Sequence, residues 1–113
     1  MTADVDEPRI FMRLTPRQHQ AIVDAFAVTF GTGVIMLFGS RTDDRQRGGD
    51  IDLYVMADGP RSPTDMARQR VAFLSRLKRC IGEQKIDMVL AAEPPRPIDR
   101  LARTQGIVLC ERH

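Results

Sequence analysis

The sequence predicts a single α+β domain, residues 1–113, in which a small mixed sheet of about four strands is flanked by three to four helices. Four apolar segments rich in branched side chains are typical of strands: residues 34–38, 50–56, 84–91 and 107–110. Two segments have capping residues at their start and apolar positions at three- and four-residue steps, which is typical of helices: residues 16–30 and 63–81.

The first helix is predicted from residue 16 to about residue 30. Thr15 can cap it, Pro16 suits the first helical position, and Gln18 can reach back to close a capping box. An apolar stripe follows that would cover one face of a sheet. Its members are Ile22, Ala25, Phe26, Thr29 and Phe30. Residues 1–14 are expected to form a frayed N-terminal segment.

The next segment, residues 34–38, is a continuous apolar run, as expected for a strand buried on both faces. Gly39 and Ser40 end this run. A glycine lets the backbone turn sharply or come close to a ligand, and backbone N–H groups at such a turn can bind phosphate. Arg41 follows and could attract a polyphosphate, and a solvated loop is an equally good account of it.

The second strand, residues 50–56, carries two aspartates on one face. Because strand side chains alternate, Asp50, Asp52 and Tyr54 share one face while the other face is apolar. We expect the apolar face to point inward and the carboxylates outward. The Cα atoms of the two aspartates would be about 6.6 Å apart, so both could bind one divalent cation or bridge two. A solvated strand edge is the alternative.

The second long helix, residues 63–81, begins after Ser62 and ends at Gly82. Its predicted apolar stripe consists of Ala67, Val71, Leu74, Leu77 and Ile81. Off this stripe lies a basic face that is either solvated or docks an acidic partner: Arg68, Arg76 and Arg79.

The third strand, residues 84–91, has an acid in its middle, Asp87. A carboxylate there is costly unless it is ion-paired, hydrogen-bonded or metal-bound. An ion pair with Lys85 or an arginine is the alternative to a metal. A proline-rich link, a short helix closed by Gly106 and a last strand at residues 107–110 complete the chain.

Gly39-Ser40, nine intervening residues and Asp50-Ile51-Asp52 resemble the signature of the DNA polymerase β nucleotidyltransferase superfamily. The longer runs FGSR and GGDIDLYV are most similar to its smallest members, the minimal nucleotidyltransferases (MNT). The ending LARTQGIVLCER is also similar to MNT proteins. Many MNT proteins pair with HEPN-domain proteins in toxin–antitoxin systems, and MNT antitoxins modify a tyrosine of the HEPN toxin.

The resemblance implies a nucleotidyltransferase fold and Mg²⁺-dependent transfer of a nucleoside monophosphate, AMP from ATP, to a hydroxyl of a HEPN-type toxin. Asp50 and Asp52 would bind two Mg²⁺ ions, and Asp87 would bind the catalytic ion and help to activate the attacking hydroxyl. The nucleotide-binding residues that the resemblance implies are Gly39, Ser40 and Arg41.

Two other functions stay open: a non-catalytic antitoxin that acts by binding alone, and a transferase for a small molecule such as an aminoglycoside. Seventeen basic and fifteen acidic residues, a net charge of +2, give no argument for direct nucleic-acid binding. No apolar run is long enough to insert into a membrane. With two separated cysteines and no export signal, a cytoplasmic location is expected.

Overall fold

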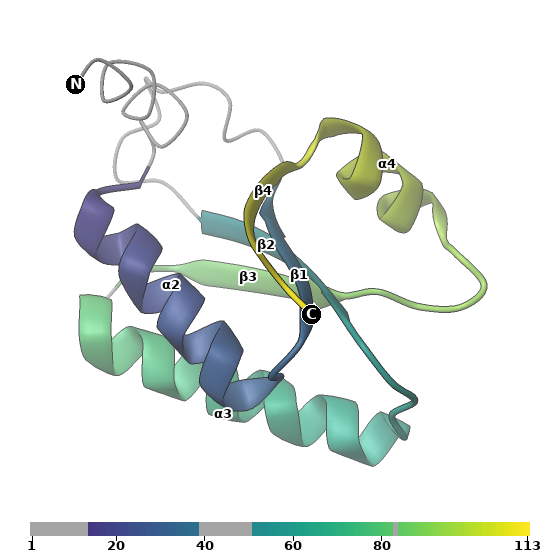
Figure 1. Ribbon diagram of the computed structural model, residues 1–113, viewed down its shortest axis with the longest axis horizontal. Helices are drawn as coiled ribbons and strands as arrows, with labels where there is room; N and C mark the ends of the chain where they lie inside the picture. The colour runs from purple at the N-terminus through teal and green to yellow at the C-terminus, as the bar shows by residue number, and fades with distance from the viewer. Residues whose placement is uncertain (1–13, 39–50, 83) are drawn as a thin grey trace.

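The computed structural model describes residues 14–38, 51–82 and 84–113. Its strands are β1 (Gly33–Leu37), β2 (Ile51–Ala57), β3 (Ile86–Leu90) and β4 (Ile107–Arg112), and its helices are α2 (Pro16–Thr29), α3 (Pro63–Ile81) and α4 (Pro97–Gln105). The strands form one sheet in the order β3-β2-β1-β4 (Figure 1). The predicted α+β fold with about four strands is therefore confirmed, and the described residues contain three helices.

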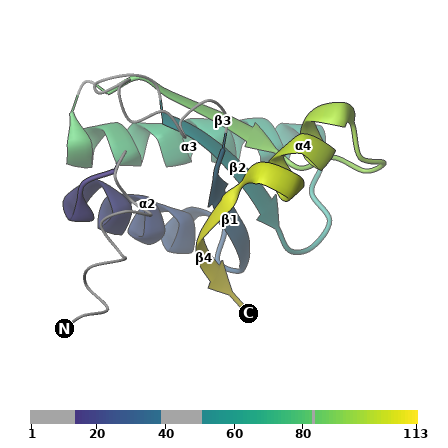
Figure 2. The same cartoon turned by 90° about the horizontal axis from the view of Figure 1, so that it is seen from above.

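The sheet is mixed because its strands are joined in two ways. Strand β1 pairs antiparallel with both β2 and β4. The connection from β2 through α3 returns to a parallel β3, which is the usual way to join parallel neighbours. Figure 2 shows α2 and α3 on one side of the sheet and α4 on the other. Helix α4 thus connects the two edge strands across the second face.

The larger part of the core lies between the sheet and the pair α2 and α3. Fully buried side chains from both helices meet the sheet there: Ile22 and Phe26 from α2, Phe73 and Leu77 from α3, and Ile35, Leu53 and Val55 from the strands. Both long helices begin with capping boxes: the predicted one, built by Thr15 with Gln18, and a second one built by Ser62 with Asp65. These boxes satisfy backbone N–H groups that the first helical turn leaves without partners.

The buried side of α3 agrees only in part with the predicted stripe: Leu77 is buried and Leu74 and Ile81 are partly buried against the core. Val71 is 64% exposed and Ala67 is exposed as well, whereas Phe73 is fully buried. The reason is that α3 packs against α2 as well as against the sheet, and the Phe73 ring lies 5.9 Å from the Phe30 ring. The two fully buried side chains of α3 are Phe73 and Leu77. A stripe chosen by spacing alone is centred about a quarter turn away from them.

The second face of the sheet carries a smaller apolar cluster under α4. Met36, Tyr54 and Ala102 are buried there, and Val34 and Phe38 are partly buried against them. At Gly106, which follows α4, an added Cβ would come within 2.5 Å of the carbonyl oxygen of Ala102 and 3.1 Å of the Met36 side chain, so a larger residue fits poorly there. Within the described part of the chain, no helix is both long and apolar enough to cross a membrane.

Candidate active site

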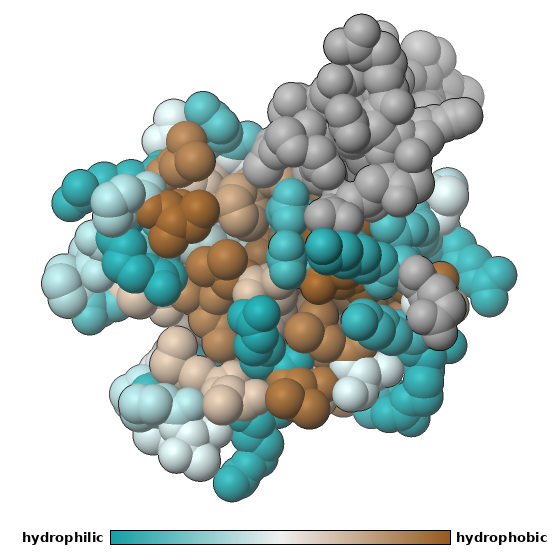
Figure 3. Space-filling model, turned by 180° about the vertical axis from the view of Figure 1, so that it is seen from behind, coloured by the Kyte–Doolittle hydropathy of each residue, from teal (hydrophilic) through white to brown (hydrophobic). Residues whose placement is uncertain are grey.

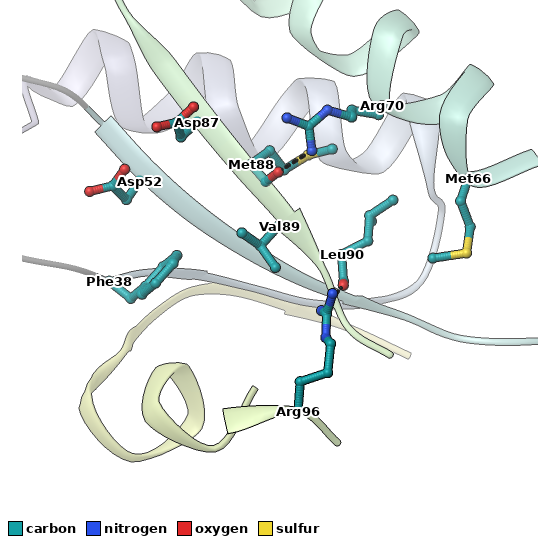
Figure 4. A pocket seen from close by; sticks show the side chains of 9 residues that line it. All are labelled: Phe38, Asp52, Met66, Arg70, Asp87, Met88, Val89, Leu90 and Arg96. Carbon is teal, nitrogen blue, oxygen red and sulfur yellow. Dashed lines mark hydrogen bonds between the residues drawn. The ribbon is translucent and has the colours of Figure 1, made fainter. Parts of the chain in front are cut away.

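Two of the predicted acids lie side by side on neighbouring strands. In the parallel register of β2 and β3, Asp52 is directly opposite Asp87. Adjacent strands are about 4.8 Å apart, and both carboxylates project to the same side of the sheet (Figure 4). Residues about 35 positions apart in the sequence are therefore within reach of a common ligand.

Strand β1 ends beside this pair. The backbone N–H of Phe38 donates to the carbonyl oxygen of Asp52 at 3.0 Å, and Gly39 and Ser40 follow Phe38 directly in the sequence. The predicted site residues Gly39, Ser40, Arg41 and Asp50 lie outside the described residues. Their roles therefore remain predictions.

Asp87 is exposed, although it lies within a strand. Within residues 14–38, 51–82 and 84–113, its carboxylate makes no ion pair with a basic side chain. The alternative account of Asp87, in which Lys85 or an arginine neutralises it, therefore gains no support from the described part of the chain. The same part contains no cluster of three or more His, Cys, Asp or Glu residues that could hold a metal ion, and Asp50, the third predicted ligand, lies outside it.

Asp52 and Asp87 line a pocket of about 550 Å³. Figure 4 shows the two acids toward one end of this pocket and Arg96 toward the other, with Val89 and Leu90 between them. Arg70 reaches the pocket from α3. The pocket thus combines a carboxylate pair with two guanidinium groups along an apolar strand.

Arg96 is held in place by a buried acid that follows it on α4. Its Nε donates to Oδ2 of Asp99 at 2.8 Å, and its Nη2 donates to Oδ1 of Asp99 at 3.2 Å. Asp99 is fully buried and also accepts a 2.6 Å hydrogen bond from the hydroxyl of Tyr54 on β2. Backbone N–H groups of Arg96 and Ala92 donate to it at 2.7 and 3.3 Å.

These contacts fix the charges of the network. The hydrogen bonds from Arg96 hold the pKa of Asp99 below its ordinary value of 3.8, against the opposing effect of burial. Burial, together with the hydrogen bond to Asp99, raises the pKa of Tyr54 to about 12. The hydrogen bond to Asp99 raises the pKa of Arg96. At neutral pH the network therefore consists of a carboxylate, a neutral phenol and a guanidinium.

The network was not predicted from the sequence, and Tyr54 departs from the expectation for its strand. Tyr54 does share a face with Asp52, but it is fully buried under α4 and does not face outward. A local signal for Asp99 does exist. It lies at the third helical position, with Pro97 at the first, where an acid can reach back to the cap residue Arg96.

The comparisons with known proteins concern the family and the fold. The family model described as "Polymerase beta, Nucleotidyltransferase" matches residues 20–113. A crystal structure of the toxin–antitoxin pair MntA–HepT matches with a TM-score of 0.60 and 20% identity over 83% of this chain and 70% of that chain. A toxin–antitoxin crystal structure with AMP-PNP matches with a TM-score of 0.64 and 22% identity over 84% and 74%.

A third similar structure holds a tri-AMPylated Shewanella oneidensis HEPN toxin in complex with an MNT antitoxin. It matches with a TM-score of 0.60 and 20% identity over 83% of this chain and 70% of that chain. No curated protein matches the sequence. At these identities the solved structures show a shared fold, whereas the family model covers most of the chain. The chain therefore belongs to the polymerase beta nucleotidyltransferase family.

Proposed function

We propose that this chain is a Mg²⁺-dependent nucleotidyltransferase that transfers AMP from ATP to a tyrosine hydroxyl of a HEPN-type toxin, for which it is the antitoxin. The observation that carries the proposal is the pairing of Asp52 with Asp87 in one pocket beside the end of β1. Support for the nucleotide and the partner comes from the similar structures, one with AMP-PNP and one with a tri-AMPylated HEPN toxin.

The donor set of the pocket fits Mg²⁺. Two like charges that face each other across adjacent strands are destabilising, and a divalent cation would turn that repulsion into attraction. Carboxylate oxygens are the ligands that Mg²⁺ prefers in proteins. Asp52 and Asp87 would hold the metal with Asp50, which immediately precedes β2 in the sequence. When bound, Mg²⁺ would neutralise phosphate charge and make a hydroxyl a better nucleophile.

The remaining role of the chain would be to position the triphosphate and the acceptor hydroxyl. Gly39 and Ser40 would bind the β- and γ-phosphates through backbone N–H groups and the serine hydroxyl, and Arg41 would add a charged donor. Asp87 is the acid on the edge strand, where an acceptor can approach from outside the sheet. We propose that Asp87 accepts the proton of the attacking hydroxyl.

The test is the variant Asp87→Asn, which keeps the size of the side chain and removes its charge. Purified chain is mixed with radiolabelled ATP, Mg²⁺ and the protein encoded next to it. We expect the initial rate of labelling to fall at least about 100-fold, because a metal ligand contributes several kcal/mol to transition-state binding. The matched control is Asp58→Asn, an exposed acid that does not line the pocket, and it should label at the wild-type rate.

Two results would contradict the proposal. One is the absence of label from any of the four nucleoside triphosphates with the wild-type chain. The other is undiminished neutralisation of the partner by Asp87→Asn and Asp52→Asn, which would instead identify a non-catalytic antitoxin that acts by binding.

A further inference from the structure

Strand β3 forms one edge of the sheet. Within the described part of the chain, β3 pairs only with β2 and ends the sheet. The backbone groups of Lys85 and Ala91 bond to β2, so by alternation those of Met88 and Leu90 point away from the sheet. Figure 3 views the molecule from behind, the side on which Figure 2 places β3, and shows apolar surface gathered among hydrophilic groups there.

Two arginines bind these outward carbonyl groups from opposite faces of the sheet. Arg70 on α3 donates through Nη1 to the carbonyl oxygen of Met88, and Arg96 at the start of α4 donates through Nη2 to that of Leu90 at 2.8 Å. Figure 4 shows both contacts along the pocket that contains Asp87. The two guanidinium groups therefore flank the strand edge beyond the acids.

Both arginines keep donors for a ligand. Within the described part of the chain, Nη1 of Arg96 and the Nε and Nη2 of Arg70 make no hydrogen bond. The side chain of Arg96 is 47% exposed, yet its orientation is fixed by the buried carboxylate of Asp99. A guanidinium group that is already ordered loses little entropy when it binds an anion, and its planar set of donors suits carboxylates and phosphates alike.

The order of the strands indicates which of the two substrates, the nucleotide or the acceptor, would approach the site from the β3 edge. Strand β1 pairs with one side of β2 and β3 with the other, and the phosphate-binding residues that the family implies come directly after β1 in the sequence. In an in-line transfer the attacking group and the leaving pyrophosphate are on opposite sides of the α-phosphorus. The acceptor would therefore approach from the β3 side.

We propose that Arg70 and Arg96 bind an acidic segment of the acceptor protein and thereby place its hydroxyl next to Asp87. The inference rests on the proposed function, since it concerns the acceptor of that reaction. Leu90 lies three positions after Asp87 along the strand, or about 10 Å. An extended acceptor segment would span this distance in about three residues, so it would carry its acid about three residues from the hydroxyl.

The probes are two synthetic peptides, each with a single tyrosine. One has glutamates three residues to either side of the tyrosine, and its twin has glutamines there. Binding to the ¹⁵N-labelled chain is followed by NMR without ATP, and ATP binding is measured separately. We expect the glutamate peptide to bind about tenfold more tightly, as one charge-assisted hydrogen bond implies, with the largest amide shifts at residues 86–96.

The variants isolate the two arginines. Arg70→Gln should reduce the preference for glutamate about threefold, and Arg96→Gln should abolish it. Because Arg96→Gln leaves the buried Asp99 without its counter-ion, the double variant Arg96→Gln/Asp99→Asn is measured beside it. The control is Arg76→Gln, which removes the same charge from α3 outside the pocket and should leave the preference unchanged.

Three results would overturn the inference: equal binding of the two peptides, an effect of Arg76→Gln equal to that of Arg70→Gln, or a loss of ATP affinity in the Arg70 and Arg96 variants without a loss of peptide affinity. The last result would assign the arginines to the nucleotide. Peptide binding needs no transfer, so a chain that discriminates between the peptides but labels no protein would contradict the proposed function and leave the acidic-segment site standing.

Discussion

Asp99 is a fully buried carboxylate, and both of its oxygens accept hydrogen bonds. Arg96, two backbone N–H groups and Tyr54 all donate to it. Burying a charge is tolerated when it is paired and hydrogen-bonded in this way. The cluster ties α4 to β2 and keeps Arg96 at the pocket, so one buried acid connects the stability of the fold to the geometry of the candidate site.

The depressed pKa of Asp99 predicts an acid-sensitive contribution to stability. A carboxyl group whose pKa is lower in the folded chain stabilises that chain above its unfolded pKa, and the stabilisation is lost as pH falls toward the folded pKa. We therefore expect the free energy of unfolding to decrease as pH falls below about 3.8, the ordinary value for this group. Urea denaturation between neutral pH and pH 2 measures this decrease.

The control for this prediction is Asp99→Asn. At neutral pH the variant should be less stable by about 2 kcal/mol, because charge-assisted hydrogen bonds are lost. Its stability should then change less than that of the wild-type chain on acidification. Parallel pH profiles of the two proteins would contradict the role assigned to Asp99.

The orientation of a side chain could be predicted where it depends on neighbouring residues in the sequence, and its burial could not where it depends on distant segments. Alternation along one strand placed Asp52 and Tyr54 on the same face, and the structure has them there. It could not show that α4 returns over that face, because this depends on the packing of segments more than 40 residues apart. Tyr54, which was expected to face solvent, is buried because α4 covers this face.

The helices and strands follow their local sequence closely. Helix α3 spans the predicted residues 63–81, because its Ser62-Pro63 start and Gly82 stop are local signals. Strand β4 runs two residues beyond the predicted end at Cys110, since pairing with β1 holds the polar residues Glu111 and Arg112 in the sheet. Boundaries set by caps could be predicted, whereas those set by pairing could not.

One buried and one exposed position of α3, Phe73 and Val71, give a direct test of its packing. Phe73→Ala should lower the free energy of unfolding by about 3–5 kcal/mol, because it removes a buried ring from contact with Phe30. Val71→Ala should change it by less than about 0.5 kcal/mol, because Val71 is 64% exposed. Urea denaturation midpoints at neutral pH measure both, and a larger effect at Val71 would restore the stripe inferred from spacing.

At the scale of the whole molecule, most of the apolar core and the candidate site lie on different sides of the sheet. One face is covered by α2 and α3 and holds most of the apolar core, while the opposite face and the β3 edge hold the acids and arginines. Placing Asp52 and Asp87 on paired strands limits their motion relative to each other, as the proposed binding of metal and phosphate at fixed distances would require. Substitutions of the acids should therefore affect ligand binding more than folding.

A thermal shift experiment tests this separation. A ligand that binds only the folded chain raises its stability by about 2.7 kcal/mol at a concentration of 100 times its dissociation constant, which for a domain of this size raises the melting temperature by about 10 °C. We expect Mg²⁺ with the non-hydrolysable analogue AMP-PNP to produce such a rise, and Mg²⁺ alone or the analogue with EDTA to produce a much smaller one. Asp52→Asn and Asp87→Asn should melt near the wild-type temperature without ligand and lose the rise, whereas Asp58→Asn should keep it. A full rise in the Asp87 variant would mean that nucleotide and metal bind the chain without the paired carboxylates.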